Sequence, residues 1–411
     1  MYFNNFDVSK NNSKDKKYLK IKDFEDSYSK TFLQNFFFNE QISEMKKYRE
    51  INCKDILIGT KQFKKSDNPD ISVIITVYNQ ANKFYSALRS VQNQSLKNIE
   101  IIIIDDCSLD NTTEIIAQYM KEDERIIYLK HESNDGKIKS RSDGVRIAKG
   151  KYITIIDGDD SLSNKNILYN SYTIAKMANL DIVQFRFALF NNKICINLNS
   201  NLDYIKNLKN RIIYQPELSH KFIYYSDNDL IEGYVNRNIV SKLIRNEVFK
   251  EILKYIGPKY TEDYILDYED TIMSVSLFKK GNSFYYMHEC GYYIAKGELV
   301  NNYPFIQSKK CKTKNFEVNK DLDSIKYLNF LLDKSSGSEI ENFLIYKELI
   351  AVVKRYKKLD KFKNVDFSNI YYILFKINQS KFYSKKMKKR ISQVKDKLLK
   401  IENTIKLKII I

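Results

Sequence analysis

Short runs of β-branched residues alternate with helix-patterned segments between residues 70 and 188, and this alternation constrains the fold more than any other feature. The runs are ISVIITV, IEIIIID, RIIYL and KYITIID, at 71–77, 99–105, 125–129 and 151–157. Short runs dominated by β-branched residues are typical of buried strands. Segments with helical spacing separate them, at 82–92, 111–121 and 139–148. This order predicts an α/β fold, with a mostly parallel sheet flanked by helices.

The regions outside this alternation show other patterns of secondary structure. A helix is predicted at 165–178 and a strand at 181–188, and the Asn-rich segment 191–210 is typical of an exposed insertion. Helical patterns return at 239–256 and 268–279, followed by an aromatic strand at 283–294. We therefore expect three parts: a helical N-terminal lead-in at 1–69, an α/β domain at 70–300, and a basic helical region at 301–411.

An acidic run follows the strand at 151–157 and is the strongest chemical signal in the sequence. Asp157, Asp159 and Asp160 lie close together, and Gly158 between them permits close approach of a neighbouring backbone. Clustered carboxylate oxygens suit Mg²⁺ or Mn²⁺, ions that often keep open positions for phosphate oxygens. A solvated acidic turn is the alternative. Because α/β sheets bind ligands at the carboxyl ends of their strands, we favour a divalent-cation site.

Two further acidic pairs have both a structural and a chemical interpretation. Asp105 and Asp106 end the strand at 99–105, where adjacent carboxylates need a donor, a cation or a ligand. Alternatively, Asp106 starts a turn or caps the next helix. Glu269 and Asp270 lie near the start of a helical pattern, where the helix dipole favours carboxylates, and a carboxylate there could also serve as a general base. Neither pair is specific by itself.

Taken in order, four segments resemble the motifs of family 2 glycosyltransferases with the GT-A fold. They are ISVIITVYNQ, SVQNQSLKNIEIIIIDDCSLDNT, SRSDGVRIAKGKYITIIDGDD and YEDTIM. The resemblance is close over 70–187 and looser over 268–294. It implies a GT-A glycosyltransferase domain at 70–300, with a nucleotide-binding half at 70–190 and an acceptor half at 191–300. The implied activity is an inverting transfer from a nucleotide-diphosphate sugar, UDP-sugar above all, to a hydroxyl acceptor such as a glycan or a lipid-linked saccharide.

The resemblance also implies a nucleotide-binding set of residues. Val77 and Tyr78 match the strand end that holds the nucleotide base, and Asp106 matches the acid that binds the imide nitrogen of the base. Arg141 matches a basic residue of the nucleotide pocket, and Asp157 is the first acid of the D-x-D region. These residues predict a site for a nucleotide-sugar donor.

The metal and catalytic residues implied by the resemblance lie in the later motifs. Asp159 and Asp160 match the acids that coordinate the divalent cation, Mn²⁺ or Mg²⁺, and the diphosphate. Asp270 matches the second acid of the E-D motif, which is the catalytic base in the family, and Glu269 is its neighbour. The resemblance thus implies a metal-dependent transferase in which the cation stabilises the leaving group.

The sequence departs from the family pattern at several positions. Thr76 stands where many members have proline, and the loop 133–139 contains Lys137 and Lys139 in place of small residues. The donor preference is open because this loop borders the nucleotide and the sugar. With no tryptophan, the chain cannot carry the Q-x-x-R-W motif of processive synthases. A single addition is therefore implied; the alternative is a non-catalytic nucleotide-sugar or glycan-binding module of the same fold.

The net charge of +18 predicts an anionic partner. Basic residues concentrate in the helical pattern at 385–408, above an apolar stripe that we expect to pack on the main body. Peripheral contact of this helix with an anionic membrane is the alternative. No base-reading motif accompanies the charge, so specific nucleic-acid binding is not expected.

Five cysteines without short metal spacing predict free thiols, and no signal peptide or membrane span is recognised. These features predict a cytoplasmic location, with the cytoplasmic membrane face as the site of any peripheral contact.

Overall fold

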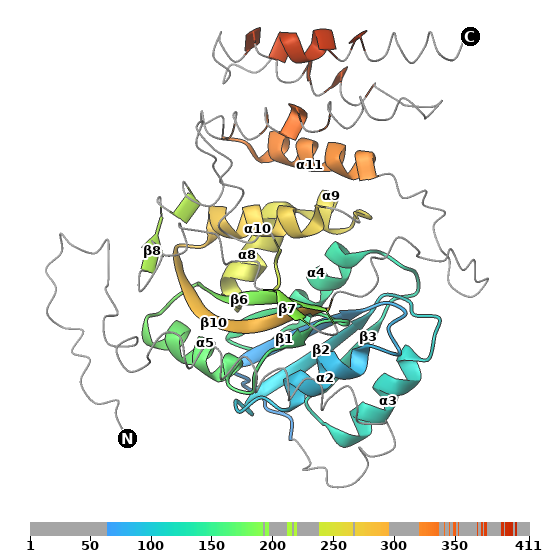
Figure 1. Cartoon of the computed structure of the whole chain (residues 1–411), viewed down its shortest axis with the longest axis vertical. Coiled ribbons are helices and arrows are strands. Elements are labelled where there is room, and N and C mark those ends of the chain that lie inside the picture. Colours follow the sequence, from blue (N-terminus) through green and yellow to red (C-terminus); the bar gives the residue numbers. More distant parts are fainter. Residues whose placement is uncertain are drawn as a thin grey trace, which may run out of the picture.

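The computed structural model describes residues 64–191, 194–196, 212–215, 218–219, 238–265, 268–295 and 320–336, together with scattered helical positions between 341 and 400, of which 391–397 is the longest run (Figure 1). The helical lead-in predicted at 1–69 therefore lies almost wholly outside the described residues. The predicted division into three parts stays a prediction.

Four parallel strands form the first half of a mixed sheet. They are β1 (Ile71–Val77), β2 (Ile99–Asp105), β3 (Ile126–Lys130) and β4 (Tyr152–Asp157), in the order β3-β2-β1-β4. Every residue of β1 and β2 is buried, because helices cover both faces of the sheet. The register pairs Val77 with Asp105 and Thr76 with Asp157, so β2, β1 and β4 end at one edge. The predicted α/β fold is confirmed.

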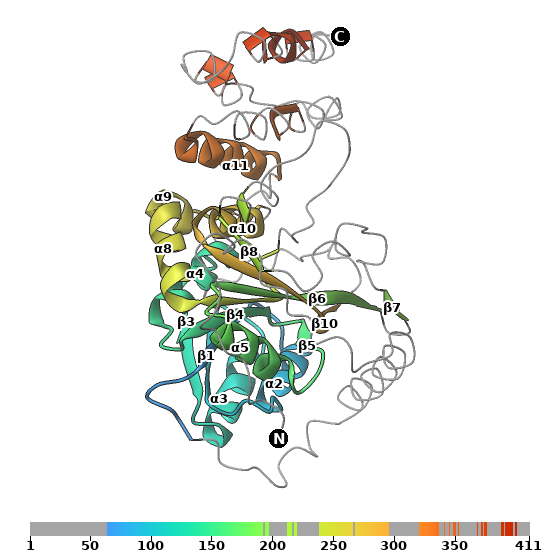
Figure 2. The same ribbon diagram turned by 90° about the vertical axis from the view of Figure 1, so that its left-hand side faces the viewer.

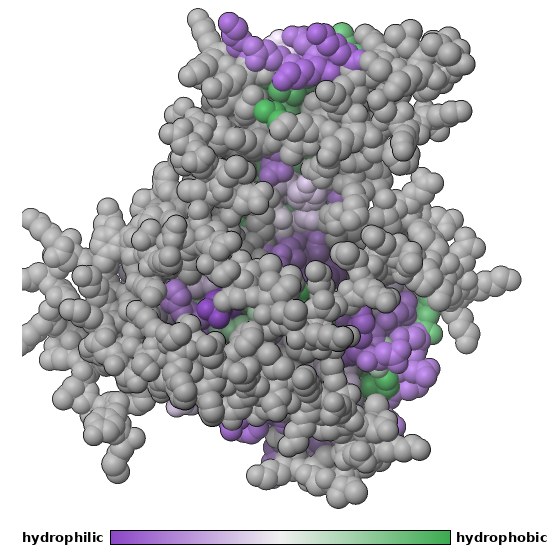
Figure 3. All heavy atoms as spheres, viewed as in Figure 1, coloured by the Kyte–Doolittle hydropathy of each residue, from purple (hydrophilic) through white to green (hydrophobic). Residues whose placement is uncertain are grey.

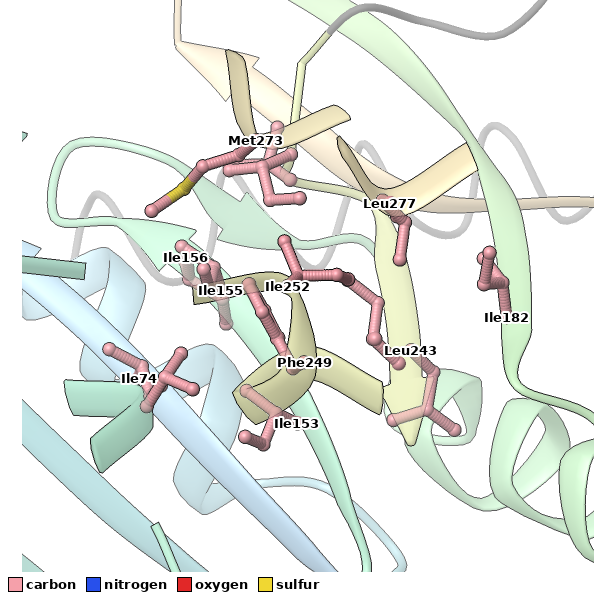
Figure 4. Close-up of a cluster of buried hydrophobic side chains, with 14 of the residues drawn as sticks. Ile74, Ile153, Ile155, Ile156, Ile182, Leu243, Phe249, Ile252, Met273 and Leu277 are labelled. Atoms are coloured by element: carbon pink, nitrogen blue, oxygen red, sulfur yellow. The ribbon is translucent and has the colours of Figure 1, made fainter. Parts of the chain in front are cut away.

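Helices cover the two faces of the sheet in two groups (Figures 1 and 2). On one face lie α2 (Phe84–Gln92), α3 (Thr112–Glu122) and α5 (Ile167–Met177); on the other lie α4 (Lys137–Ile147), α8 (Asn246–Ile256) and α10 (Glu269–Lys280). Phe249 and Ile252 of α8 and Met273 of α10 point into the core beside strand residues such as Ile153 (Figure 4). Burial of these apolar side chains holds α10, and with it the E-D motif, against the sheet.

The second half of the sheet corrects two sequence predictions. The segment predicted as helix at 239–256 begins with a strand, β9 (Lys242–Arg245), which runs antiparallel between β4 and β6 (Ile182–Asn191). The segment predicted as an exposed insertion at 191–210 contains β7 (Ile194–Ile196), which pairs with β6. The predicted aromatic strand forms β10 (Ser283–Ala295), which pairs with β6, β8 (Ile212–Tyr214) and β5 (Ser161–Leu162).

The first helix beyond residue 320 packs against the α/β domain. In α11 (Lys320–Lys334), Phe330 meets Tyr260 of α9 (Pro258–Thr261) edge to face, with the ring centroids 5.2 Å apart. Residues 391–397 are helical, and Ile391 and Val394 of the predicted apolar stripe are buried. Packing of this helix on the main body stays a prediction. The described residues at this end show a hydrophilic face in Figure 3. Among the described helices, none is long and apolar enough to cross a membrane.

The cysteines agree only in part with the prediction of free thiols. Cys290 is free, whereas Cys107 is disulfide-bonded. Spacing along the chain carries no information on which thiols approach each other in space, so the sequence could not indicate this bond.

Candidate active site

The carboxyl ends of β2, β1 and β4 bring the acidic motifs to one edge of the sheet. The backbone N–H of Asp106 donates to the carbonyl oxygen of Val77 at 2.9 Å, and Asp157 lies beside Thr76. The Val77 side chain is buried in the core, so a ligand at this edge would meet the Val77 backbone instead. Tyr78, the next residue, is half-buried.

Arg141 of α4 joins the acidic turn to the E-D motif. Its guanidinium is fully buried; Nη2 donates to Oδ1 of Asp157 at 2.9 Å, and Nη1 donates to Oδ1 of Asp270 at 2.6 Å. Oε1 of Glu269 lies 3.7 Å from the same Nη1. Because α10 begins at Glu269, its first turn faces this cation. Acids from the D-x-D region and from the E-D motif therefore meet around one guanidinium.

Asp157 and Glu269, one from each acidic motif, differ in their protonation. Burial and the neighbouring Asp270 raise the pKa of Glu269 to about 8, although Arg141 opposes this shift. Burial alone would also raise the pKa of Asp157, but attraction to Lys137 and Arg141 outweighs it and holds that pKa well below its usual range. Glu269 therefore keeps a proton at neutral pH, and Asp157 is charged. Carboxyl groups whose pKa values are pushed apart are typical of catalytic sites.

Close backbone contacts and a buried tyrosine hold the acidic turn. The N–H of Gly158 donates to the carbonyl oxygen of Thr76 at 2.9 Å, and a Cβ at Gly158 would lie 2.5 Å from Cγ1 of Val77 and 3.0 Å from that oxygen. The hydroxyl of Tyr292 donates to Oδ2 of Asp160 at 2.7 Å and accepts from the N–H of Asp157 at 3.1 Å. The motif analysis missed Tyr292, since it lies far along the chain on β10 and belongs to no acidic pattern.

Asp159 is the residue of the turn that best fits a cation. Its side chain is 29% exposed and has Lys83 Nζ 3.9 Å away. Burial and the charge of Asp157 raise its pKa, so a cation would relieve an excess of negative charge. Asp160 is buried, and both its oxygens already accept hydrogen bonds from the protein. In the described part of the chain, no group of three or more His, Cys, Asp or Glu residues that could hold a metal ion is found.

Asp106 organises the loop that precedes α4. Its Oδ1 accepts from the N–H of Asp135 at 2.8 Å and lies 2.9 Å from Nδ1 of His131, while Oδ2 accepts from the N–H of Gly136 at 2.9 Å. Gly136 has φ 88°, a conformation that favours glycine. A carboxylate oxygen has two lone pairs, so Oδ2 can accept one more hydrogen bond, from a ligand. The base-binding role of Asp106 stays a prediction.

His131 is a second residue that the sequence analysis missed. It lies between two carboxylates, with Nδ1 2.9 Å from Asp106 and Nε2 3.3 Å from Asp143 of α4. Burial alone would lower the pKa of His131, but its hydrogen bond to Asp106 and the negative charges of Asp106 and Asp143 raise that pKa to about 9. An imidazolium thus ties the end of β2 to the helix that carries Arg141. A lone histidine in a loop shows no pattern that would reveal this.

Lys242 is a third such residue, and it borders the E-D motif. Its side chain is fully buried on β9, and its ammonium donates to the carbonyl oxygen of Asn238. Burial lowers its pKa to about 7, and Asp270 partly offsets the shift. The adjoining Ile239 donates its N–H to Oδ1 of Asp270 at 3.3 Å. The segment 238–242 therefore supports the same carboxylate oxygen of Asp270 that accepts from Arg141.

Comparisons with known proteins agree with this arrangement. Residues 72–195 match the sequence model of Glycosyl transferase family 2. The chain is 34% identical over 113 residues to glycosyltransferase GlyG of Streptococcus pneumoniae, covering 28% of this chain and 37% of that protein. It is 42% identical over 90 residues to the E. coli protein WfaP, named UDP-Glc:alpha-D-GlcNAc-diphosphoundecaprenol beta-1,3-glucosyltransferase, covering 22% and 35%. The matches thus span little more than a third of these relatives.

Solved structures extend the likeness to most of the chain. The crystal structure of S. aureus TarS 1-349 in complex with UDP-GlcNAc has a TM-score of 0.54 to this protein at 16% identity, covering 82% of this chain and 89% of that one. The fold and the acidic strand ends define an α/β domain of the GT-A type. The GT-A fold implied by the four motifs is confirmed. The implied family is supported by the match over residues 72–195.

Proposed function

We propose that this chain is a glycosyltransferase that moves a sugar, with inversion, from a nucleotide-diphosphate sugar to a hydroxyl acceptor. The observation that carries the proposal is the buried guanidinium of Arg141, which bonds Asp157 at 2.9 Å and Asp270 at 2.6 Å. The guanidinium is planar and rigid, so it holds Asp157 of the D-x-D region and Asp270 of the E-D motif at a fixed separation. Such positioning is what transfer between two bound substrates requires.

A UDP-sugar is the donor we favour. WfaP is named for UDP-Glc, and the TarS crystal contains UDP-GlcNAc. In this chain the base would lie against Val77 and Tyr78, with a hydrogen bond to Oδ2 of Asp106. The diphosphate would then cross the ends of β1 and β4 towards Asp157.

Asp270 is the base in this proposal. Its side chain is 25% exposed, so an acceptor hydroxyl can reach it. Asp270 takes the hydroxyl proton as the oxygen attacks the anomeric carbon, and the bond from that carbon to the diphosphate breaks. One displacement of this kind inverts the anomeric configuration. Glu269, which holds a proton at neutral pH, is the poorer base and shapes the site around Arg141.

A divalent cation, Mn²⁺ or Mg²⁺, completes the proposal. Asp159 would hold it, with Asp160 beside it, and the bound ion would neutralise charge on the departing diphosphate. We expect MnCl₂ to raise the thermal unfolding temperature of the wild-type protein and to have a smaller effect on Asp159→Asn. An equal effect on both proteins would argue against Asp159 as the ligand.

The acceptor is a glycan or a lipid-linked saccharide, as the name of WfaP suggests by its diphosphoundecaprenol acceptor. Contact with an anionic membrane would bring the site to such a lipid. The exposed lysines of the C-terminal helix suit this contact: Lys389, Lys395, Lys397 and Lys400. The chain should cosediment with phosphatidylglycerol vesicles at low salt and not with phosphatidylcholine vesicles. Equal binding to both would contradict the electrostatic contact.

A donor screen tests the activity itself. We would incubate the purified chain and Mn²⁺ with UDP-Glc, UDP-GlcNAc, UDP-Gal and GDP-Man, and measure release of the nucleoside diphosphate. Turnover of at least one UDP-sugar, lost in Asp157→Asn, is expected. A donor that raises the unfolding temperature but is never turned over, even with a panel of acceptors, would favour the non-catalytic binding module.

A further inference from the structure

Lys137 combines an ion pair at the acidic turn with an exposed side chain. Its Nζ lies 3.2 Å from Oδ2 of Asp157, yet its side chain is 48% exposed. Arg141, on the other oxygen of Asp157, is fully buried and bonded to two carboxylates, so it is fixed in place. A lysine ammonium on a flexible, solvated stem can change partners at little cost, whereas the buried guanidinium cannot.

The place of Lys137 in the fold puts it between the ends of β2 and β4. It is the first residue of α4 and follows Gly136, whose N–H bonds Asp106 at the end of β2. Its side chain reaches Asp157 at the end of β4. A nucleoside diphosphate with its base at Asp106 and its phosphates near Asp157 would pass beside this ammonium. The first turn of α4 adds the positive end of a helix dipole on the same path.

We infer that Lys137 binds the diphosphate of the donor, leaving Asp157 for the phosphate oxygens when the nucleotide enters. This inference rests on the proposed function. The exchange is favourable because Asp157 keeps Arg141 on its Oδ1, so it is not left as an unpaired buried charge. A diphosphate also carries more negative charge than one carboxylate and attracts the ammonium more strongly.

Binding measurements on two matched variants test the inference. Lys137→Met removes the ammonium, with Lys137→Gln as a second variant. Lys151→Met is the control. Lys151 forms an equivalent ion pair with Asp70 at 3.2 Å, its side chain is 60% exposed, and it lies just before the start of β4, at the other end of the strand from Asp157.

Calorimetry would measure the affinity of each protein for UDP, CDP, GDP and dTDP. Ligand-observed NMR would measure its affinity for the nucleoside of the diphosphate that binds most tightly. Both Lys137 variants should bind that diphosphate roughly tenfold more weakly, since a charge-assisted bond is lost, and bind the nucleoside unchanged. Lys151→Met should match the wild type with both ligands.

Three results would overturn the inference. Diphosphate affinity within twofold of wild type in both Lys137 variants would show that the lysine does not contact phosphate, and the proposed function would stand. Equal losses for the diphosphate and the nucleoside would show that the variants distort the loop instead. A wild-type protein that binds none of the four diphosphates would refute the proposed function, and this inference with it.

Discussion

Replacing Arg141 by Met should destabilise the protein more than any change at its surface ion pairs. The guanidinium is fully buried and lies 2.9 Å from Asp157, 2.6 Å from Asp270 and 3.7 Å from Glu269. Removing one partner of a buried ion pair costs about 3–5 kcal/mol, because the remaining charges are left uncompensated. Since Glu269 already holds a proton, Asp157 and Asp270 carry this cost. For a domain of this size, the loss corresponds to a fall of roughly 6–20 °C in unfolding temperature.

Arg146 provides a matched control for this measurement. It lies on the same helix and also bridges two carboxylates, Asp143 at 2.5 Å and Glu262 at 2.7 Å, but its side chain is 42% exposed. Exposed pairs contribute about 0–1 kcal/mol each, so Arg146→Met should change the free energy of unfolding far less. Urea unfolding at neutral pH would compare both variants with Arg141→Lys, which keeps the charge but loses the fork and should be intermediate. The reasoning fails if Arg141→Met and Arg146→Met agree within about 1 kcal/mol.

Three further substitutions test the site, two through the pH dependence of stability and one through the packing of the acidic turn. The Glu269 pKa of about 8 lies above its ordinary 4.5, so the contribution of Glu269 to stability falls as pH rises from 4.5 to 8. In urea unfolding, the stability of Glu269→Gln relative to wild type should therefore rise by about 1–3 kcal/mol across that window. A stability difference that stays constant with pH would contradict the raised pKa. Because the His131 pKa of about 9 lies above its ordinary 6.5, the imidazolium contributes stability that is present below pH 6.5 and is lost towards pH 9. The unfolding temperature of His131→Gln should not fall in this way over that range. Parallel pH profiles of the unfolding temperature in variant and wild type would exclude the imidazolium bridge. Gly158→Ala should cost about 1–3 kcal/mol of unfolding free energy, because its Cβ would lie 2.5 Å from Cγ1 of the buried Val77. Calorimetric Mn²⁺ binding should weaken too, and an unchanged variant would show that the turn is not closely packed.

The parallel strands were predictable because their residues strongly favour a buried β-strand. β1 and β2 match their predicted ranges residue for residue, since runs this rich in Ile and Val favour strands that are buried on both faces. The strand β9 was missed for the opposite reason. Lys242 and Arg245 give its four residues a mixed polar character, and the helix that follows shares the same apolar spacing. Only the tertiary position between β4 and β6 makes the segment a strand.

The site was predictable where chemistry is concentrated in a short motif. The acids at 157–160 and 269–270 could be found because several carboxylates lie together in the sequence. The bridge between these motifs could not be found, since it depends on one arginine whose partners are 16 and 129 residues away. His131 and Tyr292 were missed in the same way, because each acts through a contact with a residue distant in the sequence.

The rate of sugar transfer by Asp270→Asn tests the central claim most directly. The claim is that Arg141 holds Asp270 as the base across from the donor acid Asp157. With the donor found in the screen, the variant should transfer sugar roughly 10²–10⁴-fold more slowly than wild type. Its affinity for the nucleoside diphosphate should stay close to that of wild type, because Asp270 belongs to the acceptor side. A transfer rate within a few-fold of wild type in a folded variant would contradict the account.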